Sequence, residues 1–152
     1  MKKILVTFTA VLLLVSMSSM LCAYDDDTQV MLETIGAFCA QGLYLTYSAI
    51  GTTIDAWSFD TYTDEDAVAM ISEYVGMCEA VKEQLEILLD SGVMNTEDDT
   101  YVSEVNETFD LLVAQGDAAI DYINTYEESY LDRFEVKRNA AWDMIEYLLG
   151  LE

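Results

Sequence analysis

The chain has 152 residues, of which 29 are acidic and six basic, and its net charge at pH 7 is −23. A surface this acidic repels nucleic acid and anionic lipid headgroups, so we expect neither as a partner. The sequence contains no histidine and no proline. It therefore lacks the most common general base and metal ligand, and no proline interrupts its helices.

The first 23 residues have the order of a secretory signal peptide. Lys2 and Lys3 are followed by an uncharged stretch from Ile4 to Val15, and Ala23 precedes an acidic run. The apolar stretch is shorter than the about 20 residues that span a bilayer. We therefore predict cleavage after Ala23, a secreted or periplasmic protein, and no stable membrane insertion after cleavage. The alternative is an uncleaved N-terminal anchor.

Residues 24–152 are expected to form a single domain, since their number suits one hydrophobic core. They contain all 29 acidic side chains and four basic ones, which gives this part a net charge of −25. Apolar residues recur in it at regular spacing, a feature that disordered acidic tails lack.

The segment 28–57 predicts a helix that is apolar over much of its circumference. One row contains Met31, Ile35, Phe38, Gly42, Leu45 and Ala49, and a second contains Leu32, Cys39, Leu43, Ile50, Ile54 and Trp57. Residues 34–54 carry no charge and are long enough to span a membrane. Their glycines, threonines and Gln41 make a poor transmembrane segment, so we interpret 28–57 as a central bundle helix.

The segment 64–90 predicts the most clearly amphipathic helix. Thr63 and Asp66 form a variant capping box, and acidic residues suit the positive end of a helix. Val68, Ile71 and Val75 begin an apolar row with the same helical spacing, and Gly92 suits the left-handed position after the last turn.

Two further helices are predicted over 98–126 and 128–149. The first has a heptad-like apolar seam, which loses its phase at Arg133 and Lys137. Thr125 and Glu128 offer a capping box that would restart a helix, but no glycine or proline forces a break, so one long kinked helix is the alternative. The sequence thus predicts an all-α, antiparallel bundle of three or four helices.

We find no pattern for catalysis, a cofactor or a metal. The run Asp60–Asp66 has the alternating oxygens of an EF-hand loop, but Glu65 stands where that loop has glycine and Ile71 where it has the bidentate glutamate. A serine or cysteine nucleophile would lack its usual histidine base. We therefore expect no enzyme, no metal and no cofactor.

The candidate interaction surface combines tyrosines with a basic cluster. Tyr122, Tyr126 and Tyr130 are spaced to line a groove between helices, and tyrosine is favoured at binding surfaces. Arg133 and Lys137 share a helix face just beyond them. The alternative is that these basic residues only offset neighbouring carboxylates.

Cys39 and Cys78 are predicted to form a disulfide. They are the two cysteines that remain after the signal is removed, and the exported compartment is oxidising. If the first two helices are antiparallel neighbours, the cysteines lie about one helical turn, or roughly 6 Å, apart along the axis. The bond would stabilise the fold by about 3 to 4 kcal/mol in the chain-entropy model. The alternative is two buried free thiols.

The sequence favours a non-enzymatic, exported interaction protein whose acidic surface meets a basic protein, peptide or cation. One alternative is a carrier that holds a small apolar ligand between the first helix and its neighbours. A carboxylate-based hydrolase is another, and adaptation of the surface to high salt is a third. The sequence does not indicate an oligomeric state.

Overall fold

The computed structural model describes the backbone of residues 2–151 and the side chains of residues 27–151. The described backbone contains four helices: α1 (Lys2–Ser58), α2 (Asp64–Asp90), α3 (Thr96–Thr125) and α4 (Glu128–Leu149). The all-helical prediction is confirmed, and α3 and α4 are separate helices. The predicted signal peptide, residues 1–23, lies outside the residues whose side chains are described.

The structure differs from the sequence prediction at the start of the first helix. We expected it near residue 28, whereas α1 begins at Lys2. No glycine or proline precedes Gly36, so the sequence offers no residue that would stop a helix there. In the described part of the chain, no helix has both the length and the apolarity that crossing a membrane requires.

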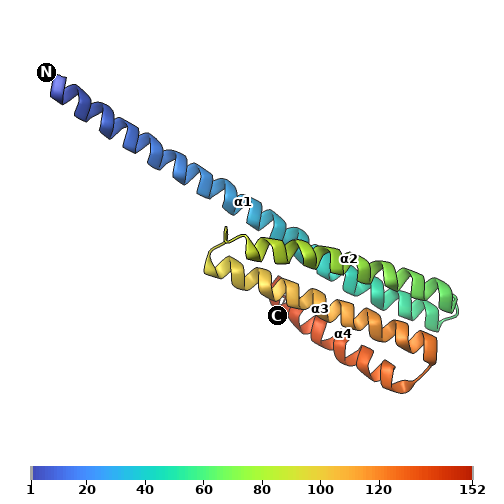
Figure 1. Ribbon diagram of the computed structural model, residues 1–152. Helices are drawn as coiled ribbons and strands as arrows, with labels where there is room; N and C mark the ends of the chain where they lie inside the picture. Colours follow the sequence, from blue (N-terminus) through green and yellow to red (C-terminus); the bar gives the residue numbers. More distant parts are fainter. Residues whose placement is uncertain (1, 152) are drawn as a thin grey trace. The chain divides into compact units, whose positions relative to one another are not determined.

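The chain divides into two compact units, Met1–Ala37 and Phe38–Glu152. The first unit contains the N-terminal part of α1, where the side-chain amide of Gln29 donates to Glu33 at 3.1 Å and Val30 and Met31 are exposed. The second unit contains the rest of α1 with α2, α3 and α4. Within it, consecutive helices run antiparallel, so the α1–α2 and α3–α4 turns lie at the same end (Figure 1).

Capping residues fix the limits of α2 and the start of α3. Thr63 Oγ1 accepts from the backbone N–H of Asp66 at 3.1 Å, and the Asp66 carboxylate accepts from the N–H of Thr63, which confirms the predicted capping box. Gly92 has a φ of 67°, as predicted for the residue after the last turn. Asn95 begins α3 by accepting from the N–H groups of Glu97 and Asp98.

The core of the second unit has two halves. The half near the α2–α3 turn, which we call the large-residue half, contains mainly bulky side chains: Leu43, Cys78, Leu85, Val102, Val105, Phe109, Leu112, Ala141 and Ile145. The half near the other two turns, the small-residue half, contains three alanines among larger neighbours: Ile50, Ala67, Ile71, Val75, Ala118, Ala119, Ile123 and Phe134.

Gly116 allows α3 to approach α1 and α2 closely in the small-residue half. A Cβ atom added at Gly116 would overlap Cγ2 of Val75 and would lie 3.4 Å from Cγ2 of Ile71 and 3.8 Å from Cδ1 of Ile50. A larger residue at this position would have to displace Val75, so the glycine lets α3 pack closely against α2 here.

Candidate functional site

The candidate site lies at the end of the second unit where the α1–α2 and α3–α4 turns meet. The α1–α2 turn reverses direction at Asp60, which has a φ of 56° and donates its N–H to the carbonyl of Trp57 at 2.9 Å. The N–H of Thr61 donates to the carbonyl of Ala56, also at 2.9 Å. These bonds close the end of α1 and reverse the chain, so that Asp64 at the start of α2 lies beside Trp57.

Asp64, the first residue of α2, connects three helices. One of its carboxylate oxygens accepts a hydrogen bond from Trp57 Nε1 at 2.8 Å. The Tyr126 hydroxyl donates to the same carboxylate, at 2.9 Å from one oxygen and 3.1 Å from the other. Asp64 therefore fixes the positions of an aromatic ring from α1 and another from the end of α3.

Three aromatic rings gather around this carboxylate. The centroid of Trp57 lies 5.7 Å from that of Tyr122, in an edge-to-face arrangement, and 5.9 Å from that of Tyr126. The centroids of Tyr122 and Tyr126 are 6.4 Å apart. Such distances are typical of favourable aromatic pairs, so the three rings form one aromatic cluster.

A surface cavity of about 760 Å³ opens beside the cluster, and we call it the end cavity. It is lined by aromatic rings, hydroxyls and three carboxylates: Trp57, Ser58, Asp60, Thr61, Tyr62, Thr63, Asp64, Glu65 and Tyr126. The hydrogen bond to Asp64 raises the pKa of the Tyr126 hydroxyl, with smaller contributions from desolvation and neighbouring acidic groups. Tyr126 thus stays protonated as a hydrogen-bond donor to Asp64.

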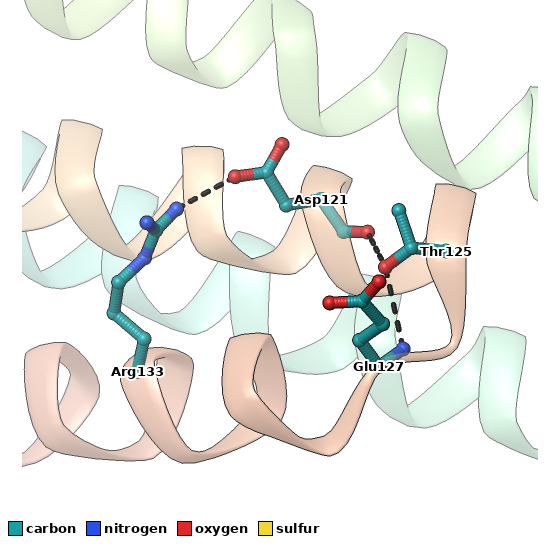
Figure 2. A network of polar contacts seen from close by, with 4 residues as sticks. All are labelled: Asp121, Thr125, Glu127 and Arg133. Atoms are coloured by element: carbon teal, nitrogen blue, oxygen red, sulfur yellow. Dashed lines mark hydrogen bonds and ion pairs between the residues drawn. The ribbon is translucent and has the colours of Figure 1, made fainter.

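A polar network closes the neighbouring α3–α4 turn (Figure 2). Arg133 Nη2 pairs with Asp121 Oδ2 at 2.6 Å. The Thr125 hydroxyl donates to the carbonyl of Asp121 at 2.7 Å and accepts from the N–H of Glu127 at 3.3 Å. Thr125 therefore stabilises the turn. The capping box that Thr125 and Glu128 offered in the sequence is absent, since the N-cap of α4 is Glu127 and makes no side-chain cap hydrogen bond.

The predicted interaction surface is only partly brought together. Tyr122 and Tyr126 join the aromatic cluster, and Tyr126 is 60% exposed. Tyr130 instead lies under Arg133, whose guanidinium carbon is 5.1 Å from the ring centroid. Lys137 is half-buried one turn further along α4. Arg133 pairs with the carboxylate of Asp121. This agrees with the alternative interpretation, in which the basic residues offset neighbouring carboxylates.

Sequence reasoning did not single out Trp57 or Asp64 for the site. Trp57 was assigned to an apolar row and Asp64 to the favourable acidic start of a helix. One signal was present: an aromatic residue seven positions before an acidic residue, on either side of a short turn. That spacing alone did not identify Tyr126 as the third member, because Tyr126 lies 62 positions beyond Asp64.

Cys39 and Cys78 are free thiols in the structure and belong to the large-residue half of the core, Cys78 as a member and Cys39 packed against it. Burial raises the pKa of the Cys78 thiol, and Thr46, which lies beside Cys78, lowers that pKa by less. Thr46 is seven residues after Cys39, which corresponds to about 10 Å along the helix axis. A disulfide requires Cα atoms within about 7 Å, so forming it would require α1 to slide along α2. The disulfide stays a prediction.

No group of three or more acidic or cysteine side chains in the described residues is arranged to hold a metal ion. No known protein family, curated protein or solved structure matches the chain.

Proposed function

We propose that the protein is a non-enzymatic interaction protein that binds a cationic partner at the end cavity. The observation that carries this proposal is the arrangement of Trp57 and Tyr126 around Asp64, with Asp60 and Glu65 on the same rim. The partner's chemistry follows from the lining: a guanidinium or alkylammonium group, presented by a basic peptide or protein.

Two physical effects support a cation of this kind. Aromatic faces attract cations through their quadrupoles, by about 0.5 to 2 kcal/mol depending on exposure. Carboxylates on the rim add a Coulomb attraction, which is strongest where the cavity wall excludes water. Asp64 already accepts two donors, so we assign it to holding the rings in place, and Asp60 and Glu65 to meeting the cation. The net charge of −23 attracts a basic partner from a distance and accelerates the encounter.

Isothermal titration calorimetry with a short arginine-rich peptide tests the proposal. We expect Asp64→Asn to weaken binding by about tenfold, because it loosens the Trp57 and Tyr126 rings as well as removing a charge. The matched control is Asp143→Asn, which removes one exposed carboxylate from α4 outside the cavity and should change affinity much less. Equal losses in the two variants would show that binding follows net charge alone and would contradict a site at the end cavity.

We also propose that the protein is exported through an N-terminal signal, residues 1–23. The support is the sequence order of two lysines, a short apolar stretch and Ala23 before an acidic run. N-terminal sequencing of the protein recovered from outside the cytoplasm should begin at Tyr24. Recovery of membrane-bound protein that still begins at Met1 would contradict cleavage and indicate an anchor.

The disulfide between Cys39 and Cys78 is part of the same proposal, since it depends on an oxidising compartment. Alkylation of the denatured, unreduced exported protein, followed by mass spectrometry, decides it. No label on either cysteine would support the bond. Two labels would show that both thiols are free and would contradict the bond.

A further inference from the structure

The exposed side of α1 in the second unit is apolar where a solvated helix face would be charged. Phe38 is 70% exposed, Leu45 65% and Tyr44 45%. The side chains of Ala40, Gln41, Tyr44 and Leu45, together with Leu149 from the end of α4, line a groove of about 360 Å³. We call Phe38 and this groove the α1 face.

The α1 face contains no charged side chain. Residues 34–54 contain no acidic or basic side chain, although the chain carries 29 acidic residues in all. By contrast, the exposed sides of α2, α3 and α4 carry many carboxylates, such as Glu83, Glu107 and Glu135. Two copies of a chain with a net charge of −23 repel each other over most of their surfaces, and this repulsion is weakest when the two uncharged faces meet.

We infer that the α1 face binds a second copy of this chain, forming a symmetric dimer in which the Phe38 side chain of each copy enters the groove of the other. A two-fold interface is self-complementary, so one helix face with both a protruding ring and a groove is sufficient. Phe38 and Leu45 are seven residues apart, the repeat with which helices pack side by side at shallow angles. This inference does not depend on the proposed function, because the end cavity lies at the opposite end of the second unit from the groove residue Leu149.

A small apolar ligand fits the α1 face less well than a second copy does. Ligand pockets bury about 70 to 90% of their ligand, which requires enclosing walls. Here two of the lining residues, Tyr44 and Leu45, are themselves 45% and 65% exposed, so they do not enclose a ligand on all sides. A second helix would cover it together with Phe38, and aromatic residues near the centre of an interface contribute much of its binding energy.

Analytical ultracentrifugation of the protein, purified in the form that the cell contains, tests the dimer. We expect a dimer whose dissociation constant falls when salt is raised, because screening weakens the repulsion between the acidic copies. Phe38→Glu and Leu45→Glu should each raise the dissociation constant by at least about tenfold. The matched control is Ile87→Glu, which places the same charge at a similarly exposed position on α2 (62%, against 65% for Leu45) and should leave the dimer intact.

Circular dichroism checks that the variants still fold. All three glutamate variants should retain the helical signal of the unchanged protein. A photo-crosslinker at position 38 should yield an adduct of twice the chain mass. The inference would be overturned if the protein were a monomer at all concentrations or if both face variants kept the dimer. It would also be overturned if the crosslinker formed an adduct only with lipid, a small ligand or a different protein.

Discussion

The two halves of the core reach tight packing in opposite ways. In the large-residue half, bulky side chains such as Leu112 and Phe109 fill the space between helices, and both are almost fully buried. In the small-residue half, Gly116, Ala118 and Ala119 on α3 let the helix backbones approach instead. The large-residue half should therefore be destabilised by loss of side-chain volume, and the small-residue half by gain of side-chain volume.

The largest effect is expected from Leu112→Ala in the large-residue half. Leu112 is 0% exposed, so its truncation leaves a cavity among residues that can relax only partly. We expect the free energy of unfolding to fall by about 2 to 5 kcal/mol. Urea unfolding followed by circular dichroism measures the change. A loss below about 1 kcal/mol would show that this half repacks around a void, which is not expected of a closely packed core.

Gly116→Ala tests the small-residue half by adding one methyl group. Its Cβ would overlap Cγ2 of Val75, so the Val75 side chain or the α2 backbone must shift, and we expect a loss of about 1 to 3 kcal/mol. The matched control is Gly76→Ala in α2, where a Cβ would meet nothing within 4 Å. This change should stabilise the helix by about 0.5 to 1 kcal/mol. A gain in stability for Gly116→Ala, as in the control, would show that the small-residue half tolerates added volume and would contradict the comparison between the halves.

An acid titration extends the comparison to the surface of the small-residue half. Partial burial, followed by the nearby charges of Asp121 and Glu79, raises the pKa of Asp117 above 3.8, and Arg133 opposes this. As the pH falls from neutral through that raised value toward 3.8, the folded state takes up the proton first, so the free energy of unfolding rises. Asp117→Asn should flatten this rise, and added salt should reduce it by screening. Identical acid profiles for the variant and the unchanged protein would contradict the assignment to Asp117.

A further effect is expected at alkaline pH in the large-residue half, where the cysteines are free thiols. Burial, as the main cause, raises the pKa of the Cys78 thiol from 9.0 to about 11. Between these values the unfolded chain ionises before the folded one, so stability falls as the pH rises from 9 toward 11. Thermal unfolding of the unchanged protein and of Cys78→Ala across this range measures the difference. The same decline in both proteins would assign the effect to another group. No decline in the unchanged protein would agree with a disulfide at Cys78.

Much of the fold was predictable because its signals are local. The capping box of Thr63 and Asp66 and the left-handed Gly92 depend on residues within a few positions of one another, and they set the ends of α2 as predicted. The candidate site was only half predictable. Its tyrosines, Tyr122 and Tyr126, were recognised by composition and spacing, whereas Asp64 gains its role only from partners on two other helices.

The sequence by itself determined the helical class, the acidic surface and most helix limits, because periodicity, capping and charge are properties of neighbouring residues. Tertiary structure decided the break between α3 and α4. No glycine or proline marks it, yet Tyr126 adopts a φ of 59° while its hydroxyl is held by Asp64. Tertiary structure also decided which apolar row of α1 is buried. Leu43 and Ile50 face the core and Phe38 and Leu45 face outward, because a helix that is apolar on both sides carries no local signal of where its neighbours will pack.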